Sequence, residues 1–126
     1  ENRTCAARVI LGPSDSAARI EFRQTAADIN PYVAMAACLG SGLYGIENRI
    51  APPPMTSGDA TGESDPAYAL PLTLEEAVDK LRGSKSAREA LGDGFVDHYL
   101  RTRDWECRRY RTIVSEWELR RYFEAV

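Results

Sequence analysis

The segment from residue 31 to residue 48 is apolar on every side of the helix that it predicts. Asn30 can cap that helix, and Pro31 suits its first turn, where a missing N–H costs nothing. The body, PYVAMAACLGSGLYGIEN, is rich in Ala, Gly and Ser, and each glycine lowers intrinsic helix stability by roughly 1 kcal/mol. Such a helix survives only when close neighbours bury it.

The part of the chain before this helix is too small to bury it. Residues 8–11 (RVIL) and 18–25 (ARIEFRQT) predict two strands, and the Gly, Pro, Ser and Asp residues between them predict a hairpin turn. A lone two-stranded hairpin is marginal in water. We therefore expect residues 1–126 to be the tail end of something larger.

After the apolar helix, the sequence predicts a long loop and then helices only. Residues 51–72 hold five of the seven prolines and read as a surface loop. A capping box at residues 73–76 begins a helix to about residue 82, and residues 86–91 form a short helix that Gly92 ends. Residues 95–125 are predicted to be helical with one interruption, near a new cap at residues 114 and 115. The predicted apolar stripe of this region is Phe95, Tyr99, Trp105, Tyr110, Ile113, Trp117, Leu119 and Phe123.

The predicted class is therefore α+β, a β-hairpin followed by four or five helices. A content of 44% hydrophobic and 28% charged residues is typical of a globular domain, and no apolar run is long enough to predict a membrane span or a secretion signal. Three widely spaced cysteines match no zinc or disulfide pattern, which favours reduced thiols in the cytoplasm. A net charge of −3 argues against nucleic acid as a partner.

One face of the second strand carries a row of charges. Arg19, Glu21 and Arg23 share that face, and Ile20 and Phe22 occupy the other, because side chains alternate along a strand. The simplest interpretation is an ion-pair ladder on a solvated edge, which also blocks unwanted strand pairing. The alternative is a binding site.

The binding-site interpretation gains weight from two further arginines, Arg3 and Arg8, because the first 23 residues hold four arginines and no lysine. Arginine presents a planar fork to phosphates. An arginine cannot ligate a cation, but a polyphosphate can bridge arginines and a divalent metal. Glu21 would then hold Mg²⁺ through a hard oxygen ligand, and the arginines would neutralise the charge that moves in phosphoryl transfer.

These residues resemble a known family. The run NRTCAAR…ARIEFR…ADINPYVAMAACLGSGLYGIENRI is similar to the C-terminal part of the glutamine synthetase catalytic domain, which has an antiparallel sheet, and the likeness extends over essentially the whole chain. The closing VSEWELRRYFE resembles the branch that joins glutamate to amines such as putrescine, the γ-glutamylpolyamine synthetase-like branch.

The resemblance implies a role for each of five residues. Arg3 corresponds to an arginine shared between the ATP phosphates and glutamate, and Arg8 to one on the ATP phosphates. Arg19 corresponds to a further nucleotide-side arginine. Glu21 corresponds to a metal ligand at the ATP-linked site, and Arg23 to the arginine that contacts glutamate and the transferred phosphoryl group.

The resemblance also implies a reaction. ATP phosphorylates the γ-carboxylate of L-glutamate, and ammonia or an amine displaces phosphate from γ-glutamyl phosphate to form an amide. Mg²⁺ or Mn²⁺ serves as the metal, and the whole protein is expected to assemble into a homo-oligomeric ring. The resemblance makes residues 1–126 the C-terminal segment of the catalytic domain, with the first part of that domain and an N-terminal domain expected before residue 1. The other metal ligands and the flap glutamate are expected there too, so the segment alone should not turn over. The alternative is a non-catalytic relative kept for binding or assembly.

Four other features favour structural explanations. His98, the single histidine, has no nucleophile at catalytic spacing, and Cys5 is expected to pack. The glycines at 40, 42 and 45 fall inside a helix, where close packing explains them better than a phosphate loop. Ser16 stands where some bacterial members of the family carry a lysine, so the resemblance supports no ATP contact from that position.

Overall fold

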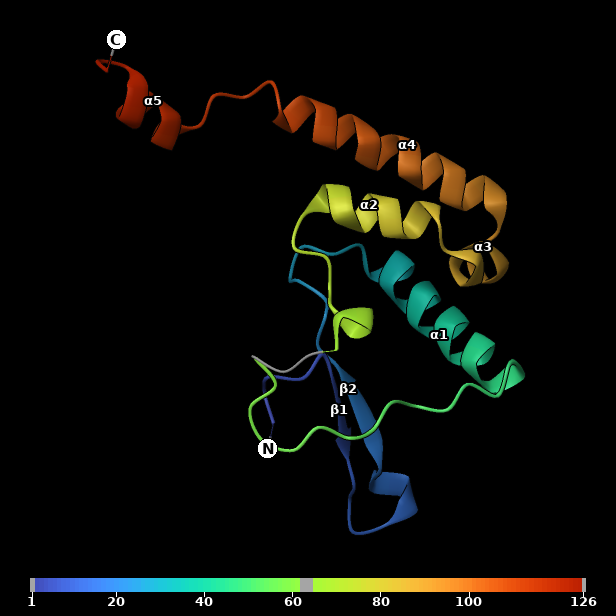
Figure 1. Ribbon diagram of the computed structural model, residues 1–126. Helices are drawn as coiled ribbons and strands as arrows, with labels where there is room; N and C mark the ends of the chain where they lie inside the picture. The colour runs from blue at the N-terminus through green and yellow to red at the C-terminus, as the bar shows by residue number, and fades with distance from the viewer. Residues whose placement is uncertain (1, 62–64, 126) are drawn as a thin grey trace. The chain divides into compact units, whose positions relative to one another are not determined.

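The chain divides into two compact units, one ending at Leu70 and one beginning at Pro71. A computed structural model describes residues 2–61 and 65–125. Its element order is a two-stranded hairpin followed by five α-helices, with two short 3₁₀ helices in the connections (Figure 1). The predicted α+β class, a hairpin followed by helices, is therefore confirmed.

The hairpin consists of strand β1 (Ala7–Ile10) and strand β2 (Arg19–Phe22), which pair antiparallel. Strand β1 has the predicted length but begins one residue before the predicted 8–11, and β2 is shorter than the predicted 18–25. Beyond the last pair, one more hydrogen bond joins the Arg23 N–H to the Ala6 carbonyl at 2.8 Å, and residues 24 and 25 leave the ladder.

The connection between the strands folds back on itself at a 3₁₀ turn, η1 (Asp15–Ala17). A Cβ atom at Gly12 would lie 2.3 Å from the Cβ of Ala17, which no real pair of carbon atoms tolerates. Gly12 is therefore required for this close return, and the return sets the register of the two strands.

Helix α1 (Pro31–Glu47) begins as the sequence predicts. The Asn30 side chain accepts hydrogen bonds from the N–H groups of Tyr32 at 3.0 Å and Val33 at 3.3 Å. No residue of α1 is buried, and Met35 and Leu39 are 61% and 66% exposed. No atom lies within 4 Å of a Cβ built at Gly42 or Gly45. The close neighbours that these glycines predict are therefore not found among the described residues of this chain.

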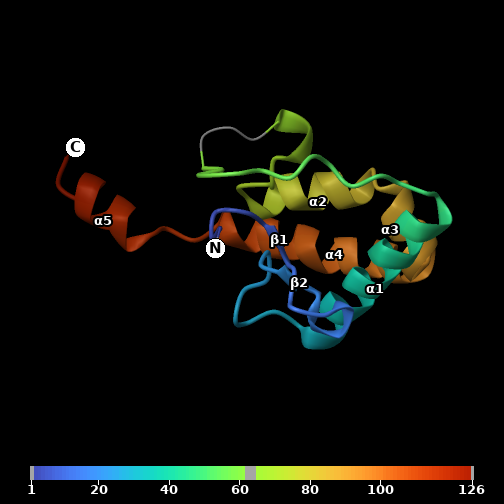
Figure 2. The same ribbon diagram turned by 90° about the horizontal axis from the view of Figure 1, so that it is seen from below.

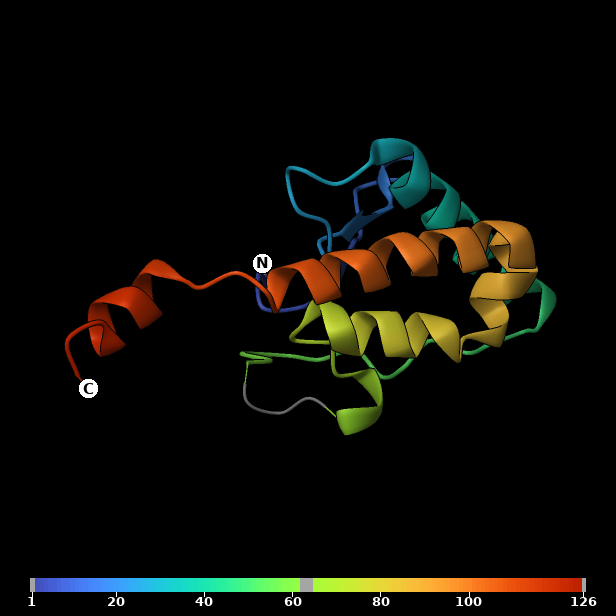
Figure 3. The same ribbon diagram turned by 90° about the horizontal axis from the view of Figure 1, so that it is seen from above.

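The described residues of the second unit, 71–125, hold four helices: α2 (Leu74–Arg82), α3 (Lys85–Leu91), α4 (Asp93–Tyr110) and α5 (Glu116–Tyr122). Helix α2 lies along α4, and α3 joins them at one end (Figures 2 and 3). Gly92, at φ +81°, ends α3 and also precedes the first turn of α4. This compact junction makes α4 start at residue 93, two residues earlier than predicted.

The core of this unit is aliphatic. Val78 on α2 and Val96 and Leu100 on α4 are buried, with Leu81, Leu91 and Cys107 packed against them. Ion pairs flank this core, since Arg82 Nη2 lies 2.9 Å from Asp104 Oδ1 and Arg111 Nε lies 2.8 Å from Glu75 Oε1. The packing of α2 on α4 therefore rests on a narrow apolar seam with ionic contacts at its edges.

The apolar stripe predicted for the last helices does not form the core of this unit. Trp105 is 55% exposed and Trp117 is 65% exposed, and the helix predicted up to residue 125 ends at Tyr122. The buried residues of α4 are instead at positions 96 and 100, with Cys107 packed behind them, a spacing of one and two helical turns. The aromatic side chains lie outside this seam.

Helix α5 is capped as predicted. The Ser115 hydroxyl accepts from the Glu118 N–H at 3.2 Å, and Glu118 accepts from the Ser115 N–H at 2.7 Å. The N–H and hydroxyl of Ser115 both hydrogen-bond the Glu118 carboxylate and hold its pKa below the usual value. The interruption between α4 and α5 covers residues 111–115.

Candidate functional site

The hairpin register places Arg8 directly opposite Glu21. The Arg8 Nη2 atom lies 2.7 Å from Glu21 Oε1, and the two side chains are 20% and 36% exposed. Directly opposed residues of an antiparallel pair share one face, so Arg8 joins Arg19, Glu21 and Arg23 there. We call these four residues the charged face.

The two faces of the hairpin differ in how far they are covered. Val9, Ile20 and Phe22, on the opposite face, are 53%, 69% and 47% exposed, whereas Arg8 and Glu21 are partly buried. An exposed row of large apolar side chains beside a covered charge pair reverses the usual arrangement. The centre of the charged face, Arg8 and Glu21, is therefore more covered than the apolar face, whereas Arg19 and Arg23 at its ends are exposed.

Three more arginines of the hairpin region, Arg3, Arg19 and Arg23, have no carboxylate partner among the residues that the structure describes. Arg19 Nη1 donates a long hydrogen bond of 3.4 Å to the Ala17 carbonyl, and Arg19, Arg23 and Arg3 are all exposed. The ion-pair ladder in which Glu21 would pair with Arg19 and Arg23 on its own strand is therefore wrong, because Glu21 pairs across the strands with Arg8. Three guanidinium groups stay available to an external anion.

The Arg8–Glu21 pair is incompletely satisfied. Arg8 Nε is buried with no hydrogen-bond partner, and Glu21 is paired through Oε1 only within residues 2–61 and 65–125. A buried donor without a partner costs about 1–3 kcal/mol. The second Glu21 oxygen is open to a cation, and the exposed guanidinium groups of Arg19 and Arg23 are open to the oxygens of an anion. The residues present therefore fit a metal-bound polyphosphate.

Glu21 supplies only part of a metal site. No cluster of three or more His, Cys, Asp or Glu side chains able to hold a metal occurs within the described ranges 2–61 and 65–125. A divalent cation with oxygen ligands takes about six of them, and phosphate oxygens and water commonly supply several. Glu21 therefore fits as one ligand of a site that other segments complete.

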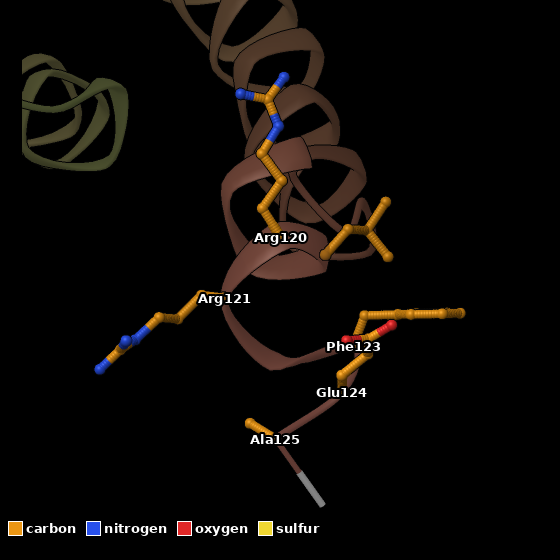
Figure 4. A pocket seen from close by; sticks show the side chains of 6 residues that line it. Arg120, Arg121, Phe123, Glu124 and Ala125 are labelled. Atoms are coloured by element: carbon orange, nitrogen blue, oxygen red, sulfur yellow. The ribbon is translucent and has the colours of Figure 1, made fainter.

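Two hollows in the described part of the second unit, on α4 and α5, do not include the charged face. One is lined by residues of α5 and the tail that follows it, where Arg120 and Arg121 point away from each other (Figure 4). It is lined by Leu119, Arg120, Arg121, Phe123, Glu124 and Ala125. Because its two cations diverge, this hollow does not form a fork for an anion.

The structural explanations for the remaining candidates agree with their surroundings. His98 lies exposed on α4, beside Thr102 and Trp105. Cys5 is a free thiol of intermediate exposure, and the Ser16 hydroxyl lies 2.9 Å from that of Ser14 inside the hairpin connection. Within the described residues, no helix is long and apolar enough to cross a membrane.

A family comparison decides the class of the chain. Residues 1–122 match the glutamine synthetase catalytic domain. The chain belongs to the glutamine synthetase family. The predicted fold, part of a glutamine synthetase-like catalytic domain, is confirmed by this match.

Several curated proteins are similar over the full length of the chain. It is 41% identical to type-1 glutamine synthetase 2 of Dictyostelium discoideum, spanning 24% of that protein. It is 43% identical to a glutamate–isopropylamine ligase of Pseudomonas sp, spanning 28%, and 40% identical to a γ-glutamylethanolamide synthetase of Streptomyces coelicolor, spanning 26%. The chain thus spans about a quarter of the length of these relatives.

The sequence prediction found the charged residues of this glutamine synthetase segment but missed two arrangements. It did not pair Arg8 with Glu21, because the register depends on the length and shape of the connection. It also missed that Asn2 and Thr4, on either side of Arg3, hydrogen-bond to the long loop. The only available signal was the polar character of these two residues.

Proposed function

We propose that this chain is the C-terminal segment of the catalytic domain of an ATP-dependent glutamate–amine ligase. The reaction forms a γ-glutamyl amide through γ-glutamyl phosphate. The observation that carries the proposal is the facing of Arg8 and Glu21 across the hairpin, within a family match that covers residues 1–122. The segment alone is expected to be inactive.

The proposed roles follow from charge and position. Glu21 holds Mg²⁺ or Mn²⁺, which when bound neutralises phosphate charge at the ATP-linked end of the site. Arg8 and Arg19 bind the phosphates of ATP. Arg3 and Arg23 bind the phosphoryl group and the glutamate carboxylate, where fixed donors stabilise the negative charge that gathers during transfer.

A strand is a suitable support for these roles. Arg19, Glu21 and Arg23 are held at two-residue intervals on one face, and the hydrogen-bonded ladder fixes Arg8 opposite Glu21. The guanidinium groups of Arg19 and Arg23 are free of carboxylates within the described residues, so no internal ion pair must break before an anion binds. The positive charges are therefore in place before an anion binds, and phosphoryl transfer depends on charges fixed in this way.

The rest of the protein is proposed to cover the open surfaces of this segment. The apolar side of the hairpin and most of α1 are exposed here, including Ile20 at 69% and Leu39 at 66%. The relatives are about four times longer than the chain, which leaves ample polypeptide to bury these surfaces. From the family resemblance, the full-length protein is also proposed to assemble into a homo-oligomeric ring.

The acceptor is proposed to be an organic amine, with putrescine-like amines first among the candidates. The closing sequence VSEWELRRYFE resembles the amine-using branch. Two of the similar proteins are named for amine chemistry, one as a glutamate–isopropylamine ligase and one as a γ-glutamylethanolamide synthetase. The third, a type-1 glutamine synthetase, has comparable identity, so ammonia is the competing acceptor.

Phosphate release by the full-length protein tests the function. We expect release from ATP only with L-glutamate, Mg²⁺ and an amine together, in a panel of ammonia, putrescine, spermidine, ethanolamine and isopropylamine. Glu21→Ala should lower turnover by at least about 100-fold, the scale of losing one charge-stabilising group. Glu124→Ala, which removes an exposed carboxylate in the other unit, is the matched control. Nucleotide binding without release for any acceptor would instead establish a non-catalytic relative.

A further inference from the structure

The chain on both sides of Arg3 is fastened to the long loop. The Asn2 Nδ2 atom donates to the Gly58 carbonyl oxygen at 2.7 Å, and the Ala60 N–H donates to the Thr4 hydroxyl oxygen at 2.9 Å. Each pair is separated by 56 residues in the sequence. Two tertiary hydrogen bonds therefore bracket a single residue.

Asn2 and Thr4 are also bonded to each other. The Thr4 N–H donates to Asn2 Oδ1 at 2.9 Å, and the Thr4 hydroxyl donates to the same oxygen. The amide of Asn2 thus accepts with its oxygen and donates with its nitrogen, and the Thr4 hydroxyl donates once and accepts once. Every polar atom serves in a role that its chemistry allows, so the four groups form one network.

The loop side of this network is shaped in advance. Gly58 has φ +83°, a backbone conformation that residues with a Cβ rarely adopt. The Asp59 carboxylate accepts from the Thr61 N–H at 2.9 Å and from the Thr61 hydroxyl at 2.7 Å, and these bonds hold the pKa of Asp59 below its usual value. We call residues 58–60 the docking turn.

We infer that the docking turn is a positioning element for Arg3. This inference rests on the proposed function, in which Arg3 contacts the phosphoryl group and glutamate. Arg3 makes no side-chain hydrogen bond within the described ranges, so its backbone position fixes where the guanidinium group starts from. The turn acts on Arg3 through Asn2 and Thr4 and does not itself need to touch substrate. A displacement of about 1 Å at such a group can lower the rate about 100-fold.

Substitutions of Thr4 and Asn2 in the full-length protein separate this role from simple packing. Thr4→Val removes the hydroxyl at constant shape, and Thr4→Ser keeps it. Asn2→Asp keeps the oxygen that accepts from Thr4 and removes the donor to Gly58. Thr56→Val is the matched control, because the Thr56 hydroxyl has no hydrogen-bond partner in the described part of the chain.

We expect Thr4→Val and Asn2→Asp to lower kcat/KM for ATP and for glutamate by about 10- to 100-fold, with KM for the amine changed by less than about twofold. Thr4→Ser and Thr56→Val should stay within about threefold of wild type. A general loss of folding would lower every parameter together. The contrast between the two substitutions of Thr4 excludes that explanation.

Hydrogen exchange at the Ala60 amide provides a readout that is independent of turnover. It should be protected in the wild type, exchange at least about tenfold faster in Thr4→Val, and remain protected in Thr56→Val. An active wild type with unchanged kinetics in both Thr4→Val and Asn2→Asp would overturn the positioning role and leave the proposed function standing. A wild type that releases no phosphate with any amine would refute the proposed function itself. If Thr4→Val does not fold, Asn2→Asp decides, since it retains the Thr4 hydroxyl.

Discussion

Exchanging the charges of the Arg8–Glu21 pair separates a structural ion pair from a binding site. In the double variant Arg8→Glu and Glu21→Arg, the two opposite charges remain in contact across the hairpin, but each stands in the other's place. A pair that only joins the strands tolerates this exchange. A pair that binds a metal and a phosphate does not, because the guanidinium group would then occupy the metal-ligand position.

The expected energies follow from the geometry of the pair. The atoms are 2.7 Å apart and the side chains are 20% and 36% exposed. Two unit charges about 4 Å apart attract by about 4 kcal/mol at an effective dielectric constant of 20. Desolvation and side-chain ordering leave a net value of about 1–2 kcal/mol. Either single neutralisation, Arg8→Gln or Glu21→Gln, should therefore increase local opening of the hairpin about 5- to 30-fold.

Hydrogen exchange at the strand amides and phosphate release, both measured on the full-length protein, form the assay. We expect the exchanged pair to restore strand protection to within about threefold of wild type, while phosphate release stays at least about 100-fold lower. Restored strand protection together with restored turnover would refute the assignment of Glu21 to the metal and return the pair to a purely structural role.

Three further predictions concern the second unit. Val96→Ala removes two carbons from a side chain that is 0% exposed and should lower the free energy of unfolding of this unit by about 2–3 kcal/mol. In the same denaturant titration, the control Val114→Ala, at a site 63% exposed, should change that free energy by less than about 0.5 kcal/mol. Because hydrogen bonds from Ser115 lower the pKa of Glu118, the capped first turn of α5 should be stable above the ordinary carboxyl pKa and lose that stability as the pH falls through the lowered value. Ser115→Ala should remove this pH dependence of the α5 amide shifts in NMR spectra, and an unchanged profile would contradict it. Gly92→Ala should destabilise the α3–α4 junction by roughly 1–2 kcal/mol through the positive φ of this residue alone, since no atom lies within 4 Å of the new Cβ. The Cβ position at Gly94 is also open, so an equal loss of stability in Gly94→Ala would argue against this cause.

Local signals in the sequence located the helix starts well. Asn30, Thr73 and Ser115 each cap the helix that follows them, because their short side chains reach N–H groups in the first turn. These contacts involve residues at most three positions apart, so the sequence alone contains the information that they need.

Packing was less predictable from the sequence, because the size of an apolar side chain does not decide whether it is buried. Trp105 and Trp117 are the largest apolar side chains of their segments and lie mostly exposed, whereas Val96 and Leu100 are buried. The aliphatic residues match the helical period that faces α2, and the tryptophans do not. Periodicity relative to a specific neighbour decided burial in α4.

The candidate site was predictable in composition but not in arrangement. The alternation of charges on the second strand placed Arg19, Glu21 and Arg23 on one face, and the hairpin confirmed that alternation. The partner of Glu21 depended on the turn at Gly12 and the short η1 helix, whose geometry the sequence did not reveal. The chemical roles came from family resemblance and stay proposals.

A structure of the full-length protein with a non-hydrolysable ATP analogue and Mg²⁺ tests the central claim most directly. We predict that Glu21 ligates the metal and that Arg8 and Arg19 donate hydrogen bonds to the phosphates, with Arg3 and Arg23 at the terminal phosphate. A structure in which the nucleotide binds elsewhere and the charged face contacts only protein or solvent would contradict the account.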